Sequence, residues 1–198
     1  KNVGLKNESV TGKNNEFRYG GLVGVTKDAT INNCYTTGSV SAQIEEGSGD
    51  KDAYAGGLIG SSENTIINNS YSATNVTATN ATQDSVFSGG LVAYGSKITI
   101  NNCYSVGNVS ASNTYTSSYV NNIHSGGLVA YGLDITINNC YSAGNISTSI
   151  ACTYSGYSIY YTAGGLVGYS NKVNIYNGFV LGKVDRYATS NKANAGDI

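Results

Sequence analysis

Short stretches in which apolar and polar residues alternate recur along the whole chain. The sequence ITIN occurs at 98–101 and again at 135–138, with Thr between two Ile residues each time. This alternation predicts half-buried β-strands, and β-branched residues, which favour strands, are abundant in these stretches. Gly and Asn cluster between them, and no segment of about ten residues has the i, i+3, i+4 apolar spacing of a helix. We therefore expect an all-β protein.

The strand stretches belong to a module that recurs five times. Its clearest copy is GGLVAYGLDITINNCYSAGNIS at 126–147, and the other copies start at Gly20, Gly56, Gly89 and Gly164. In every copy the first Gly precedes one small residue by 14 positions. These small residues are Cys34, Ser70, Cys103, Cys140 and Gly178. Because the segment from there to the next Gly pair varies between 19 and 24 residues, the pattern indicates a rigid module with an insert of adjustable length.

The repeat length of 33 to 38 residues is typical of solenoids, in which each unit buries its apolar face against its neighbours. Each module has about three strands, too few for a four-stranded propeller blade but suited to one coil of a parallel β-helix. Equivalent residues of stacked coils lie above one another, so the sequence should contain columns. One apolar column is Leu22, Leu58, Leu91, Leu128 and Leu166. We predict a β-solenoid of about five coils with variable inserts.

A second column consists of asparagine. Its members are Asn33, Asn69, Asn102, Asn139 and Asn177. Asn tolerates the left-handed backbone conformation of a sharp turn, and its amide group can donate to the side-chain carbonyl of the Asn in the next coil. We interpret this column as a structural ladder and not as a ligand site.

The chain reads as a single repeat domain over 1–198, with repeats starting near 20, 56, 89, 126 and 164. Residues 1–19 resemble the back half of a first coil, and 185–198 resemble the start of a further one. Two explanations stay open. The chain is a piece of a longer array, or the half coil at one end completes the half coil of another subunit in a head-to-tail filament. The second idea rests on AGDI followed by KNVGLKN reading as one continuous coil.

Composition excludes several classes of function. Charged residues are 12% and the formal net charge is −1, so the chain lacks the basic footprint of a nucleic-acid-binding protein. No apolar run reaches the roughly 18 residues of a membrane-spanning helix. The Gly pairs have none of the lysine and strand-to-helix context of a phosphate-binding loop. We expect no cofactor.

Catalytic groups are also scarce. Polysaccharide cleavage, a common activity of β-solenoids, needs two or three carboxylates close together. From Ser85 to Asn171 the only charged residues are Lys97 and Asp134, and His124 is the only histidine of the chain. We therefore predict no catalytic residues and no metal site. The acidic insert 41–55 matches no calcium-loop spacing and is interpreted as a solvated loop.

The inserts at 110–125 and 147–163 are rich in Tyr, Ser, Asn and Gly, the mixture that binding loops use. Loops on a rigid scaffold often carry function. Candidate contacts to a glycan or protein ligand are Tyr115, Tyr119, Tyr154, Tyr157, Tyr160 and Tyr161. The alternative interpretation is that these rings only pack on the flank of the solenoid.

Three of the four cysteines, Cys34, Cys103 and Cys140, share the small-residue column and are expected to be buried there. Cys152 lies in an insert, and a disulfide from it to Cys140 or to another chain stays open. Glycosylation sequons begin at Asn7, Asn75, Asn80, Asn108 and Asn145.

The repeats resemble a known family. GGLVGV, GGLIGS, GGLVAY and GGLVGY, each followed by INNCY, INNSY or a relaxed version, are similar to the GLUG motif. This motif occurs in tandem in large exported bacterial proteins, including adhesins and the non-catalytic region of certain immunoglobulin A peptidases. The opening KNVGLKNESVTG resembles the segment that commonly precedes such repeats, and the fifth copy departs from the pattern with IYNGF.

The resemblance implies a right-handed parallel β-helix at the cell surface, without catalytic residues. We expect an extracellular, non-enzymatic protein that builds a rod, either as an adhesin stalk or as the subunit of a head-to-tail surface filament. The alternative is a carbohydrate- or protein-binding adhesin module that uses the Tyr-rich inserts.

Overall fold

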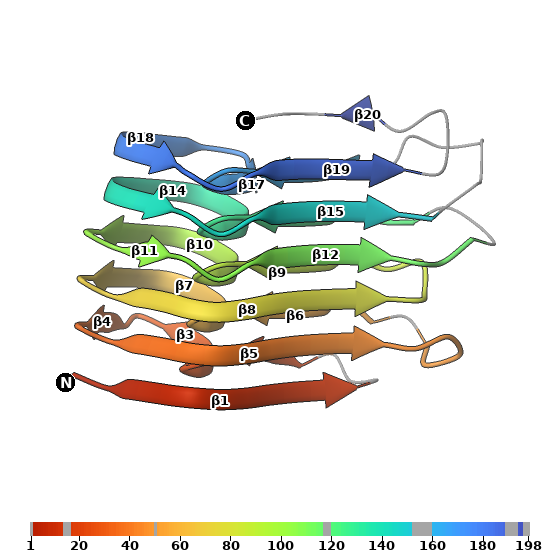
Figure 1. Cartoon of the computed structure of the whole chain (residues 1–198), viewed down its shortest axis with the longest axis horizontal. Helices are drawn as coiled ribbons and strands as arrows, with labels where there is room; N and C mark the ends of the chain where they lie inside the picture. Colours follow the sequence, from red (N-terminus) through yellow and green to blue (C-terminus); the bar gives the residue numbers. More distant parts are fainter. Residues whose placement is uncertain are drawn as a thin grey trace.

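The structure is a computed structural model that describes residues 2–13, 17–49, 51–116, 120–151, 160–188 and 194–195. It confirms the all-β parallel solenoid, because each recorded pairing between strands is parallel and joins one coil to the next. In Figure 1 the nearer strands run to the right and the strands behind them run to the left while the chain rises from the N-terminus. The coil is therefore right-handed, as the resemblance to GLUG repeats implied.

Each coil has three sides. The first side is a parallel sheet of short strands. Each of them except the last, β20, ends at the first Gly of a Gly pair. The strands of this side are β2 (Arg18–Gly20), β6 (Ala53–Gly56), β9 (Val86–Gly89), β13 (Ile123–Gly126), β16 (Tyr160–Gly164) and β20 (Asn194–Ala195).

The second and third sides belong to one continuous sheet that bends at the Asn corner. The second side contains β3 (Val23–Lys27), β4 (Thr30–Asn32), β7 (Ile59–Asn68), β10 (Val92–Asn101), β17 (Val167–Ser170) and the first parts of β14 (Val129–Ser142) and β18 (Val173–Val180). The third side contains β1 (Gly4–Lys13), β5 (Tyr35–Ile44), β8 (Tyr71–Asn80), β11 (Tyr104–Ser105), β12 (Val109–Asn113), β15 (Ile146–Ile150) and β19 (Val184–Ala188).

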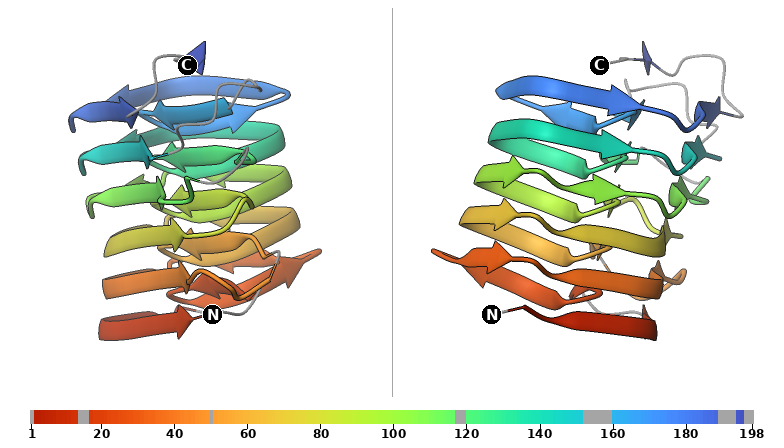
Figure 2. Two further views of the ribbon diagram at one scale, coloured as in Figure 1. Left: turned by 90° about the vertical axis from the view of Figure 1, so that its right-hand side faces the viewer. Right: turned by 60° about the vertical axis from the view of Figure 1, so that its left-hand side comes forward.

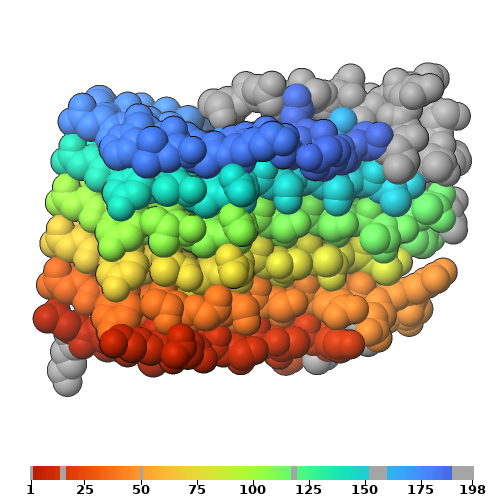
Figure 3. Space-filling view, viewed as in Figure 1, coloured from red at the N-terminus to blue at the C-terminus, as the bar shows by residue number. Residues whose placement is uncertain are grey.

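Equivalent residues of successive modules pair without a shift in register. Ile100 of β10 lies between Ile67 of β7 and Ile137 of β14, and all three side chains are buried. The predicted Leu column lies in the interior, where Leu58, Leu91 and Leu128 are fully buried. Figures 2 and 3 show the result as a stack of layers that follow one another in sequence order.

The Gly pairs are required by close approach between backbones. A Cβ atom at Gly127 would collide with the carbonyl oxygen of Gly165 in the next coil and with the hydroxyl of Ser142 in its own coil. A Cβ atom at Gly126 would collide with the carbonyl of Val129. The second Gly of a pair therefore makes room for a buried Thr or Ser on the opposite side, in a column formed by Thr36, Ser72, Ser105 and Ser142.

The C-terminal coil presents apolar side chains instead of a polar cap. Ile175 of β18 is 40% exposed, whereas its partner Ile137 in the coil before is fully buried. Beside Ile175 lies an open groove of about 330 Å³, lined by Gly165, Leu166, Val167, Ile175, Val180 and Val184. The groove has the shape and chemistry of the interface between two coils.

The two ends of the described chain add to neighbouring coils. Ala195 of β20 lies opposite Tyr161, and Asn2 accepts a hydrogen bond from Asn33. The joining of AGDI to KNVGLKN in one coil stays a prediction.

Duplication of one coil tests whether the modules stack independently. Repeating residues 89–125 three times after position 125 should lengthen the stack by about 14 Å, since parallel strands are about 4.8 Å apart. The urea midpoint should rise, because each added coil brings a new interface with its neighbour. Small-angle scattering and denaturant unfolding give the two measurements.

The matched control carries Ser in place of Leu91, Ile98 and Ile100 in each added copy only. It should not gain stability, because these three side chains are buried between coils. Protease-sensitive, unstacked insertions with an unchanged urea midpoint would contradict a modular solenoid.

Candidate functional site

The Asn33 column forms a ladder at the corner between the second and third sides. Nδ2 of Asn102 donates to Oδ1 of Asn69 at 3.2 Å, and Nδ2 of Asn139 donates to Oδ1 of Asn102 at 3.1 Å. The bond from Asn177 to Asn139 is 2.9 Å long. Every Asn of this column has a φ between 48° and 53°, the left-handed conformation that Asn tolerates better than most residues. The ladder is exposed, and its amide groups are engaged with one another.

A second asparagine ladder, which the sequence analysis missed, stands directly beside the first. Nδ2 of Asn68, Asn101 and Asn138 donates to Oδ1 of the Asn one coil earlier, at 2.7 to 2.8 Å. The signal was present, because the first Asn of INN also recurs. Both Asn residues of the motif are therefore accounted for by contacts between coils.

A ladder of aromatic rings follows the Asn corner and was also missed. Neighbouring rings stack 4.8 to 5.1 Å apart and within 8° of parallel, in the order Tyr35, Tyr71, Tyr104, Tyr141 and Phe179. This distance is the spacing of the strands themselves. Because each inner ring is covered on both faces by its neighbours, only the ring edges are open to a ligand.

The cysteine column is a hydrogen-bonding column. The Cys103 thiol donates to the carbonyl of Asn101 at 3.1 Å and accepts from the backbone N–H of Ser70 at 3.4 Å. Cys140 accepts from the backbone N–H of Cys103 at 3.3 Å. Ser70 performs the same task with its hydroxyl, which accepts from the N–H of Cys34 at 3.0 Å. A small side chain that both donates and accepts explains why Cys and Ser share this column.

Burial shields the thiols of this column, because Cys34, Cys103 and Cys140 all lie in the interior. The hydrogen bond with Cys103 lowers the pKa of the Cys140 thiol, so its burial is what limits its reactivity. The hydrogen bond with Cys140 and burial raise the pKa of Cys103, so it stays protonated at neutral pH and is a poor nucleophile. Cys152 lies outside the described residues.

The three described tyrosines among those proposed as ligand contacts lie in three different places. Tyr161 points into the core, where it packs with Ile123 and Ala163 and is 7% exposed. It cannot contact a ligand from there, so this assignment was wrong. Side chains alternate between the two faces of β16, and Tyr161 lies on the inward face with Ala163. The amino-acid composition of an insert does not show which face a residue takes. Tyr119, Tyr154 and Tyr157 lie outside the described residues.

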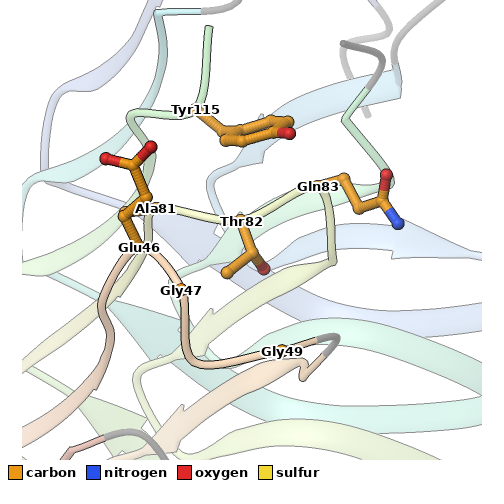
Figure 4. Close-up of a pocket in the computed structure, with 7 residues that line it drawn as sticks. All are labelled: Glu46, Gly47, Gly49, Ala81, Thr82, Gln83 and Tyr115. Atoms are coloured by element: carbon orange, nitrogen blue, oxygen red, sulfur yellow. The ribbon is translucent and has the colours of Figure 1, made fainter. Parts of the chain in front are cut away.

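Tyr115 lines a cavity of about 370 Å³ at the insert end of the solenoid (Figure 4). Three successive inserts supply its walls, which are Glu46, Gly47, Gly49, Ala81, Thr82, Gln83 and Tyr115. In Figure 4 the Tyr115 ring lies above Thr82, with the Glu46 carboxylate to one side. The sequence analysis found Tyr115 but not the residues that other coils bring to it.

Two buried asparagines hold this cavity in shape. Oδ1 of Asn80 accepts from both the N–H and the hydroxyl of Thr82 at 2.8 Å. Oδ1 of Asn113 accepts from the N–H of Tyr115 at 2.9 Å, and its Nδ2 donates to the carbonyl of Thr82 at 2.9 Å. The local signal was Asn two residues before the residue that it fixes, as in an Asx-turn.

Asn80 is therefore a structural residue and not a glycosylation site. It is fully buried, and its Nδ2 donates to the carbonyl of Lys51 at 2.8 Å. A glycan on this atom is incompatible with the fold, so this assignment was wrong. The other sequon residues, Asn7, Asn75, Asn108 and Asn145, are exposed. The last three stand in one column, where Oδ1 of Asn75 and of Asn108 accepts from the backbone N–H one coil later.

Tyr160 lines a second cavity, also of about 370 Å³, near the corner between the first and second sides. Its other walls are Asn122, His124, Tyr131 and Tyr169. His124 is 1% exposed, and its Nδ1 lies 2.7 Å from Oγ1 of Thr162. Burial lowers the pKa of His124 to about 4, so the ring is neutral at pH 7.

The charged side chains that form recorded ion pairs lie on the solvent-exposed surface. These pairs are Lys13–Glu45, Lys27–Glu63, Lys172–Asp134 and Lys183–Asp185. Within the described ranges there is no group of three or more His, Cys, Asp or Glu side chains that could hold a metal ion. The same residues contain no helix of the length and apolarity that crossing a membrane takes.

Comparison with known proteins supports the fold. No protein-family model and no curated protein matches the chain, so the likeness to GLUG repeats stays a resemblance. The crystal structure of a "putative immunoglobulin A1 protease" from Bacteroides ovatus is similar, with a TM-score of 0.51 and 22% sequence identity. The match covers 84% of this chain and 49% of that one, so the chain spans about half the length of its structural neighbour. At this identity the two proteins share a related fold and nothing further is implied.

Substitution of Asn102 separates the two contributions of the ladder to stability, which are the side-chain hydrogen bonds between coils and the tolerance of Asn for the left-handed backbone. Asn102→Ala should reduce the free energy of unfolding by about 2 to 4 kcal/mol, because it removes two side-chain hydrogen bonds and puts Ala in the left-handed region. Asn102→Gly should cost about 1 to 2 kcal/mol, since Gly accepts that conformation. Urea unfolding measures both, and equal losses in the two variants would contradict the backbone part of the explanation.

Protonation of His124 should make the fold sensitive to acid. The unfolded chain takes up a proton near pH 6.5, whereas the folded chain does so only near pH 4. The contribution of a neutral His124 to stability is therefore complete above pH 6.5 and is lost as the pH falls towards 4, by about 3 kcal/mol at most. His124→Phe keeps a ring without a titrating group. In this variant the free energy of unfolding, measured with urea at several pH values between 4 and 6.5, should depend less on pH. An unchanged pH dependence in that variant would disprove the assignment to His124.

Proposed function

We propose that the chain is an extracellular, non-enzymatic structural repeat module that forms part of a rod, as the stalk of an adhesin or as a unit of a surface filament. The observation that carries this proposal is the continuity of the side-chain ladders. Asn, Tyr and Cys or Ser occupy the same place in coil after coil and are used up in contacts between coils. The recurring residues of the motif thus build a stack.

The open C-terminal groove supports growth of the stack. Five coils at about 4.8 Å rise only about 24 Å, and Figure 1 shows that the long axis of this piece runs along the strands. A rod therefore needs further coils. The groove beside Leu166 and Val180 offers them an apolar surface, and a further coil of the same kind would fit it.

An extracellular position is supported by the resemblance of the repeats to the GLUG motif of exported proteins. The structural neighbour from Bacteroides ovatus is named as a protease, and its likeness to this chain concerns the solenoid. In the described part of this chain the two cavities are lined by Tyr, Gly, Ala, Thr, amide and His side chains, with Glu46 the single carboxylate of the first cavity. The described walls of neither cavity offer the paired carboxylates that glycoside hydrolysis requires.

A binding role for the inserts is the second candidate. It is favoured by the Tyr115 cavity, which three inserts form together and two buried Asn residues fix. Rigid loops of this kind reduce the entropic cost of binding.

The proposal is tested on intact cells of the producing organism. Antibodies against the 1–198 chain should label unpermeabilised cells, and added protease should remove the label. A cytoplasmic protein serves as the control for cell integrity. Electron microscopy of the labelled cells then distinguishes a cell-bound stalk from filaments. Labelling that requires permeabilisation would contradict the proposal.

A further inference from the structure

Aromatic rings pack against one another at the corner where the first side meets the second. One column is Tyr54, Phe87, His124 and Thr162, which point away from the central core that their neighbours Ala55 and Ile123 fill, and all four are buried. A parallel column that covers them is Tyr94, Tyr131 and Tyr169. Rings of the two columns contact each other between coils, as Phe87 does with Tyr131 at 5.5 Å between ring centroids.

The first column loses its ring at Thr162. His124 stands directly before this position, and its ring stacks on Tyr169 at 5.2 Å and contacts Tyr131 at 5.7 Å. The cavity of about 370 Å³ opens beside these rings, with Tyr160 and Asn122 as its remaining walls. Tyr169 and Tyr160 are 38% and 57% exposed, so the cavity is reached from solvent. We call it the His124 cleft.

The described lining of the His124 cleft is uncharged. Its residues supply three phenol groups, one imidazole and one carboxamide. The imidazole is neutral at pH 7, and its Nε2 has no hydrogen-bond partner among the residues that the structure describes. A charged ligand would lose its hydration without gaining a partner of opposite charge among these wall residues.

We propose that the His124 cleft binds a neutral saccharide. A sugar ring has an apolar C–H face that packs on an aromatic ring, whose face carries negative partial charge, and hydroxyl groups that satisfy the imidazole nitrogen and the carboxamide. The volume lies in the range of small-molecule sites, about 300 to 1,000 Å³. The site is independent of the coil interface and of the Tyr115 cavity, so it adds a recognition function to the structural module.

Titration of the 1–198 chain with neutral disaccharides tests the proposal. The probes are lactose, maltose, cellobiose and N,N′-diacetylchitobiose, followed by ligand-observed NMR and calorimetry. We expect at least one to bind with a Kd of about 1 mM or tighter, and a digalacturonate to bind at least about tenfold more weakly because of its charges. Binding of none of the neutral probes, or preference for N-acetyl-tyrosinamide as a mimic of a protein partner, would overturn the proposal.

Three variants locate the binding. Tyr169→Ala removes an exposed wall of the cleft and should weaken binding at least about tenfold. Thr162→Phe would continue the ring column over His124 and should abolish binding by filling the cleft. It also removes the hydrogen-bond partner of Nδ1 of His124, so a lower urea midpoint is expected and binding is measured where the variant is folded. Tyr176→Ala is the matched control, since Tyr176 belongs to the same coil, is 59% exposed and lies outside the cleft.

The pattern across the variants decides the outcome. Loss of binding in Tyr169→Ala and Thr162→Phe with retention in Tyr176→Ala would support the site. Unchanged binding in either cleft variant, or an equal loss in Tyr176→Ala, would place the sugar elsewhere and overturn the assignment. The urea midpoint of each variant shows that the measured loss does not come from unfolding.

Discussion

The structure depends on parallel pairing of successive coils, in which the five modules stay in register and the one recorded shift lies in β1, between Leu5 and Glu8. Backbone hydrogen bonds between coils hold equivalent positions about one strand spacing apart, so each residue type meets its own kind in the next coil. Asn meets Asn, Tyr meets Tyr and Cys meets Ser or Cys at distances that suit an amide ladder, a ring stack and a thiol hydrogen bond. One geometric constraint thus selects several chemically different columns.

The same constraint explains which positions vary. A residue in a column contacts two coils, and a change there disturbs both interfaces. Residues in the inserts do not have to match a residue in the next coil. The inserts, which connect the third side of one coil to the first side of the next, therefore differ in length. Asn113 nevertheless holds the backbone at Tyr115, and Asn80 holds the backbone at Thr82 in the preceding insert. At these two positions a buried residue of the coil fixes the start of a loop.

The outer corner shows how a repetitive scaffold gives rise to a single site. In the part of the column that consists of rings, Tyr54 packs on Phe87 and Phe87 packs on His124. Thr162 interrupts that series, and the His124 cleft adjoins the interruption. Function in a solenoid is thus expected at the place where a column is broken and not where it is regular.

The sequence by itself determined the fold class and the columns of Leu, of the second Asn of INN and of Cys or Ser, because a fixed spacing of 14 residues and a repeated INN motif express contacts that recur in each coil. It could not place residues that occur once. The inward position of Tyr161, the burial of Asn80 and the meeting of His124 with Tyr169 were decided only by the tertiary structure. Each depends on which face of a short strand a side chain takes and on which residue of another coil stands opposite, and neither is encoded in the local pattern.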